Sequence, residues 1–116
     1  MRTMTCILIC LACLGLAAPL SAADYETGIQ AFSHKDYRVA VANILPLAAQ
    51  GEAKAQFAAG VLYQKGAGVL QDNALAWYWF TKALENGHDK AGQMRELLEG
   101  SMTDEEKEQA ARYLEE

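Results

Sequence analysis

Cysteine is missing from all but the beginning of this chain. The three cysteines, Cys6, Cys10 and Cys13, lie within the first 23 of the 116 residues. If that segment is cleaved off, the remainder has no thiol. This excludes a disulfide, a zinc site built on cysteine and a cysteine nucleophile. The folded part must therefore be held together by apolar packing alone.

Basic residues are also few. The chain has 10 Lys and Arg against 15 Asp and Glu, which gives a formal net charge of −5. The basic residues are scattered along the sequence and form no cluster. Proteins that bind nucleic acid or anionic lipid present basic patches, so the composition argues against both kinds of partner.

Patterns typical of β-strands are absent as well. Val, Ile and Thr never alternate with polar residues over the length of a strand, whereas Ala, Leu, Glu, Gln and Lys dominate. We predict an all-α fold in which Pro46, one of two prolines, bends the second helix because it has no N–H to donate. The expected helices are Tyr25–Ser33, Asp36–Ala49, Ala53–Gln64, Asp72–Asn86, Asp89–Glu99 and Thr103–Glu115.

The first 23 residues have the three parts of a secretory signal peptide. Arg2 supplies the positive start, residues 7–18 form an uninterrupted apolar run, and Ser21 and Ala23 suit signal peptidase. We predict cleavage between Ala23 and Asp24, with export to the periplasm or the cell exterior and no membrane insertion afterwards. The alternative is an uncleaved membrane anchor, which Pro19 and the small residues after it disfavour.

An internal repeat becomes visible when the sequence is shifted by 36 residues. The shift aligns Asp36 with Asp72, Ala40 with Ala76, Gly51 with Gly87, Lys54 with Lys90 and Ala55 with Ala91. The two aspartates suit helix N-caps, and the two glycines suit the left-handed residue that ends a helix. Thr103 and Glu106 have the spacing of a capping box. The offset is typical of stacked helical hairpins.

Residues 53–91 carry a more specific pattern. It consists of Ala55-Gln56-Phe57, Gly60, Tyr63, the connection Gly66-x-Gly68-Val69-x-Gln71-Asp72, a helix with Ala76, Trp79-Phe80 and Lys82-Ala83, and then Asn86-Gly87-His88. This pattern resembles a Sel1-like repeat, a relative of the tetratricopeptide repeat, with Leu70 in the place of the usual proline. Residues 24–51 resemble a tetratricopeptide-type hairpin, with Lys35 where glycine is customary.

The resemblance implies a short α-solenoid of antiparallel helix pairs with a concave face that binds proteins or peptides. The expected parts are a signal peptide (1–23), a TPR-like hairpin (24–51), a Sel1-like repeat (52–88) and C-terminal capping helices (89–116). The resemblance implies no reaction, because the family as such has none.

Candidate partner-binding residues lie on the first helix of each pair, which lines the concave face in this repeat class. Aligning Gly28 with Gly60 places a set of side chains there. Tyr78 is added because it belongs to neither apolar stripe of its helix and should face solvent. The candidates are Tyr25, Ile29, Lys54, Phe57, Val61, Gln64 and Tyr78. A role in the core is an equally good reading for Tyr25, Ile29 and Phe57.

No residue pattern indicates catalysis, a cofactor or a metal. Gly66 and Gly68 lack the lysine and the strand of a phosphate-binding loop. His34 and His88 have no partner at metal-ligand spacing, so His88 is expected in a turn or cap. We therefore predict a non-enzymatic interaction protein. The alternatives are a small cell-wall or glycan hydrolase, and a structural protein that self-associates, for example as a homodimer.

Overall fold

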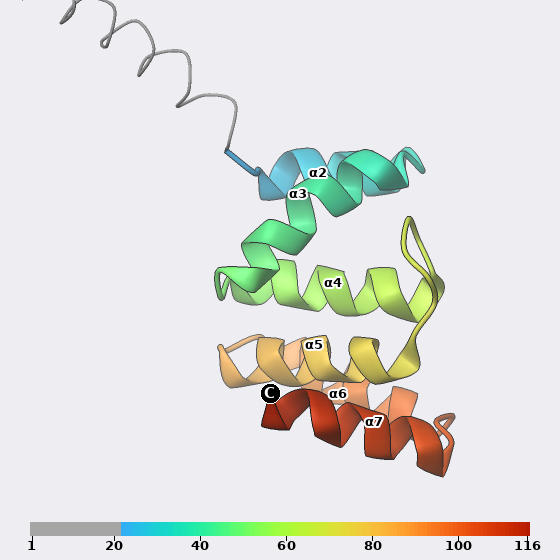
Figure 1. Cartoon of the computed structure of the whole chain (residues 1–116). Helices are drawn as coiled ribbons and strands as arrows, with labels where there is room; N and C mark the ends of the chain where they lie inside the picture. Colours follow the sequence, from blue (N-terminus) through green and yellow to red (C-terminus); the bar gives the residue numbers. More distant parts are fainter. Residues whose placement is uncertain (1–21) are drawn as a thin grey trace, which may run out of the picture.

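The computed structural model describes residues 22–116, which form helices joined by short connections (Figure 1). No strand occurs in this range, so the all-α prediction is confirmed, and every predicted helix boundary is correct to within one residue. The predicted signal peptide lies outside the described residues except for Ala22 and Ala23. The helices are α2 (Tyr25–Ser33), α3 (Tyr37–Ala49), α4 (Ala53–Lys65), α5 (Asn73–Glu85), α6 (Asp89–Glu99) and α7 (Asp104–Glu115).

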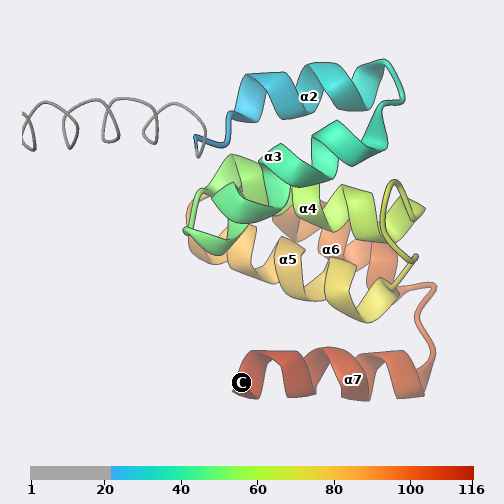
Figure 2. The same cartoon turned by 45° about the horizontal axis from the view of Figure 1, so that its top comes forward.

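Consecutive helices stack as antiparallel neighbours. The chain packs α2 on α3, α3 on α4, α4 on α5 and α5 on α6, whereas α7 packs on α5 (Figures 1 and 2). The ribbon of α3 changes direction along its length, as predicted for a helix with Pro46 in its second half (Figure 1). This arrangement is the predicted short α-solenoid of helix pairs.

Side-chain caps begin three of the six described helices, α2, α5 and α7. Asp72 accepts a hydrogen bond from the Leu75 backbone N–H at 3.1 Å, as predicted. Thr103 and Glu106 form the predicted capping box, which starts α7. The prediction for Asp36 is wrong in one respect: it occupies the N-cap position of α3, but its side chain accepts no hydrogen bond from that helix. Asp24 caps α2 instead, a role that the repeat did not indicate.

Left-handed residues end the helical pairs. Gly51 and Gly87 have φ values of +97° and +96°, as expected for glycines that terminate helices. Lys35 occupies the turn between α2 and α3 with φ +63°. A side chain in this conformation costs about 1 kcal/mol, which explains why glycine is customary there.

The core consists of small side chains around a few large ones. Alanines from α2, α3 and α4 surround Ile44 and Leu62, and alanines from α5, α6 and α7 surround Phe80. These three are the largest side chains that are fully buried among the described residues. Alanine allows neighbouring helices to approach closely, so the positions of the few large side chains determine the spacing between helices.

Candidate binding groove

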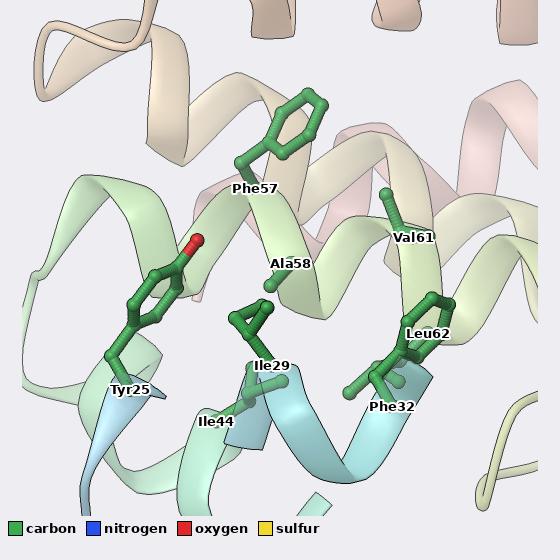
Figure 3. Close-up of a pocket in the computed structure, with 8 residues that line it drawn as sticks. All are labelled: Tyr25, Ile29, Phe32, Ile44, Phe57, Ala58, Val61 and Leu62. Atoms are coloured by element: carbon green, nitrogen blue, oxygen red, sulfur yellow. The ribbon is translucent and has the colours of Figure 1, made fainter. Parts of the chain in front are cut away.

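An apolar groove lies between α2 and α4, with α3 at its floor (Figure 3). The cavity has a volume of about 200 Å³. The hydroxyl of Tyr25 is the only polar side-chain atom among the lining residues. The lining residues are Tyr25, Ile29, Phe32, Ile44, Phe57, Ala58, Val61 and Leu62.

Four of the seven predicted binding residues meet in this groove. Tyr25 and Ile29 line it from α2, and Phe57 and Val61 line it from α4. The other two candidates from α4 do not line the cavity: Lys54 is exposed and Gln64 is half-buried. The predicted stripe on α4 therefore lines the cavity with its middle residues, Phe57 and Val61, and not with its first and last residues, Lys54 and Gln64.

The remaining lining residues were not predicted. Phe32 follows Ile29 by three positions, Ala58 follows Lys54 by four, and Leu62 follows Ala58 by four, so helical periodicity contained a signal for them. Ile44 comes from the second helix of the pair. Only the packing of α2 on α3 brings Ile44 into the groove. The two helices approach so closely there that a Cβ on Gly28 would lie 2.8 Å from the Cγ1 atom of Ile44.

Phe57 is shared between the groove and the core. Its ring centroid lies 5.6 Å from that of Phe80 and 4.3 Å from that of His88, on which it stacks with an interplanar angle of 10°. It also lines the cavity. The two readings of Phe57, core residue or groove residue, are therefore both correct.

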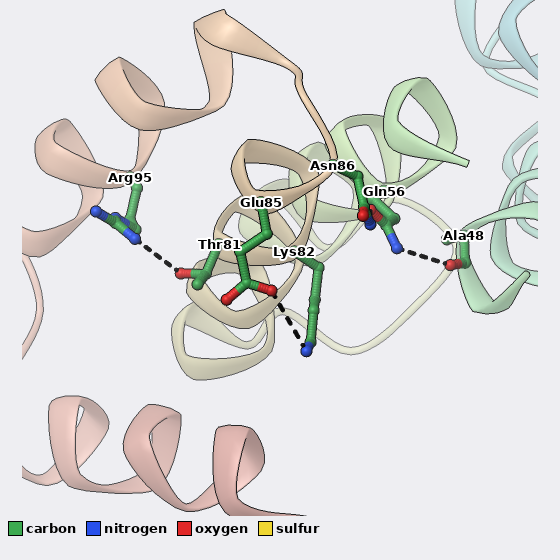
Figure 4. A network of polar contacts seen from close by, with 7 residues as sticks. All are labelled: Ala48, Gln56, Thr81, Lys82, Glu85, Asn86 and Arg95. Carbon is green, nitrogen blue, oxygen red and sulfur yellow. Dashed lines mark hydrogen bonds and ion pairs between the residues drawn. The ribbon is translucent and has the colours of Figure 1, made fainter. Parts of the chain in front are cut away.

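Gln56 links α4 to α3 and to the end of α5 (Figure 4). Its side chain is 4% exposed, donates to the carbonyl of Ala48 at 3.1 Å and accepts from the amide of Asn86 at 2.8 Å. Because a buried amide is costly to leave unpaired, these bonds hold α4 in one rotation relative to α3 and α5. The groove face of α4 is thereby directed towards α2.

Tyr25 provides the polar atom at one end of the groove. Burial raises the pKa of its hydroxyl, and the nearby charges of Glu26 and Glu52 raise it further. The hydroxyl therefore stays protonated at neutral pH and can donate a hydrogen bond to a bound partner.

Comparison with protein families places α4 and α5 in one unit. Residues 53–88 match the family model of the Sel1 repeat. We call residues 53–88 the Sel1 repeat, after the family model that they match. The chain matches no curated protein and no solved structure with which it was compared. Because Sel1 repeats generally mediate protein–protein interaction, the match indicates an interaction module.

The structure places the Tyr78 side chain differently from the prediction. We expected Tyr78 to face solvent, but it is half-buried, and its ring lies 5.1 Å from Trp79 and 6.2 Å from Tyr113 of α7. The ammonium of Lys82 lies 5.7 Å from the same ring. The prediction failed because α7 packs on α5, a long-range contact that the sequence of α5 does not reveal.

The last residue of the Sel1 repeat, His88, occupies the N-cap position of α6, in agreement with its expected place in a turn or cap. Its side chain makes no capping hydrogen bond and stacks on Phe57 instead. Among residues 22–116, no three His, Asp or Glu side chains are grouped as a metal site would require. None of the described helices has the length and apolar character needed to cross a bilayer.

A second cavity, of about 300 Å³, lies beside α7. Trp77 and Glu99 line it, but the Trp77 indole N–H already donates to the Glu99 carboxylate at 2.7 Å. The same carboxylate lies 3.9 Å from the Arg95 guanidinium. Trp77 and Glu99 are thus engaged with each other, whereas Lys107 also lines this cavity. The groove between α2 and α4 has the more apolar lining and contains four of the predicted residues, so it is the better candidate site.

Proposed function

We propose that this chain is an exported, non-catalytic protein that binds another protein in the cell envelope or outside the cell. The observation that supports this function most strongly is the apolar groove between the first helices of two consecutive pairs. One wall of the groove belongs to the Sel1 repeat. Open apolar grooves of this kind suit the apolar side chains of a partner segment.

Four of the predicted residues have distinct roles in this proposal. Ile29 and Val61 supply the apolar walls, and Tyr25 supplies one hydrogen-bond donor. Lys54 lies three residues before Phe57, on the same side of α4, and is exposed. It therefore serves as a flanking contact for a partner that extends beyond the cavity.

The groove is tested by filling it. We expect Val61→Trp to reduce the recovery of a cross-linked partner from the native cells by about tenfold, because the indole would occupy the volume that the partner needs. The measurement is mild cross-linking of the tagged full-length protein, followed by affinity purification and mass spectrometry. Capture equal to that of the wild type would contradict the role of the groove.

Val39→Trp is the matched control for this experiment. Val39 lies on α3, is 37% exposed and does not line the groove. The same substitution there should leave partner capture unchanged. Circular dichroism should show equal helix content for both variants, so that a loss of capture cannot result from unfolding.

Export is tested separately. The signal-like pattern of residues 1–23 supports cleavage before Asp24. An immunoblot of native cells should show one band that migrates with a protein starting at Asp24, in the exported fraction. A native band at the size of the full chain would contradict cleavage and would favour the uncleaved anchor.

A further inference from the structure

The two ends of the groove can be distinguished because α2 and α4 run in the same direction (Figure 1). Tyr25 and Phe57 mark the end near the helix N-termini, and Phe32 and Leu62 mark the other end (Figure 3). Charged residues that flank the groove at one end are therefore contributed by the same end of both helices.

The two ends of the groove carry different charges. Lys65 ends α4 and follows Leu62 by three positions, so it continues the face of α4 that lines the groove. Neither Lys54 nor Lys65 takes part in an ion pair among the described residues. The Tyr25 end has three acids and one basic residue, namely Asp24, Glu26, Glu52 and Lys54. The Phe32 end has three basic residues and two acids, namely Lys35, Arg38, Lys65, Asp36 and Asp72, the last of which donates its backbone N–H to the Tyr63 carbonyl.

The size of the cavity limits what it holds. An apolar cavity of about 150 Å³ in a protein core is large enough to bind benzene. The groove, at about 200 Å³, therefore has room for one side chain of phenylalanine size. Charges on either side of this anchor would lie beyond the apolar walls, near the two ends of the groove.

We propose that the groove binds a segment of a partner protein that has one bulky apolar anchor between charges of opposite sign. The acidic side of the segment lies at Lys65, and the basic side lies at Glu26 and Glu52. This inference rests on the proposed function, because it describes the ligand of the same groove. Apolar contact supplies most of the affinity, and the charges determine the orientation.

The test uses three fluorescein-labelled peptides of equal length, each with a central phenylalanine in an alanine background. One carries lysines at one end and glutamates at the other, the second carries glutamates at both ends, and the third carries lysines at both ends. Fluorescence anisotropy with the protein starting at Asp24 should show the mixed peptide binding about fivefold more tightly than either other peptide. The preference should shrink at high salt, which screens exposed charges.

A charge-reversal variant tests the assignment of the ends. Lys65→Glu makes both ends acidic, so the lysine-ended peptide should become the tightest ligand. Lys107→Glu makes the same charge change on α7 and should leave the order of the three peptides unchanged. Val61→Trp should abolish binding of all three, because it fills the anchor site.

Three results would overturn the inference. They are equal affinities for the three peptides, an unchanged order in Lys65→Glu, and no binding by any peptide. In each case the proposed function stands if Val61→Trp still prevents partner capture in cells. If Val61→Trp leaves capture intact, the proposed function itself fails.

Discussion

Replacing Phe80 with alanine is expected to remove about 3–5 kcal/mol from the free energy of unfolding. Phe80 is fully buried, and its ring packs against Gly60 and Phe57. Native proteins have unfolding free energies of about 5–15 kcal/mol, so this loss would remove a large fraction of the stability. Urea denaturation of the protein starting at Asp24, followed by circular dichroism, measures the change.

Phe32→Ala provides a matched control for Phe80→Ala. Phe32 is only half-buried and faces the groove, so the same truncation removes fewer contacts. We expect a loss about half as large, near 1.5–2.5 kcal/mol. An equal or greater loss for Phe32→Ala would contradict the assignment of Phe80 as the principal core residue of the Sel1 repeat.

Gly60→Ala should destabilise the protein by about 1–3 kcal/mol, although alanine is the better helix former. A Cβ at this position would lie 2.5 Å from Cε1 and 2.6 Å from Cδ1 of Phe80. The fully buried ring has no space into which it can withdraw, so α4 and α5 must separate. The unfolding free energy from the same urea titration measures this cost.

Gly92→Ala is the control with the opposite expected sign. Gly92 also lies inside a helix, but a Cβ there would lie 3.5 Å from the nearest atoms of Leu84, an ordinary contact. This substitution should stabilise the protein by about 0.5–1 kcal/mol through helix propensity. If both variants were stabilised, the close packing of Gly60 on Phe80 would be wrong.

Phe80 and Gly60 matter for function because the core of the Sel1 repeat supports the groove. The Phe57 ring contacts Phe80 in the core and stacks on His88 at the start of α6. A shift of the Phe80 ring would move the Phe57 ring that lines the cavity. Groove shape and repeat stability are therefore coupled through one aromatic contact.

Local features of the sequence were sufficient to predict the helices. The boundaries follow from residues such as Asp72, Gly87 and the Thr103–Glu106 pair, whose effects act within one turn of the chain. The family resemblance pointed to the concave faces of α2 and α4. The spacing of 3.6 residues per turn then placed Tyr25 and Ile29 on one of these faces and Phe57 and Val61 on the other.

Tertiary structure decided everything that depends on how helices lie against one another. It brought Ile44 into the groove, left Lys54 and Gln64 outside the lining, and covered part of Tyr78 with α7. These outcomes depend on the distances and crossing angles between helices. Those are determined by long-range contacts such as Gly60 with Phe80 and Gly28 with Ile44, which no local pattern in the sequence specifies.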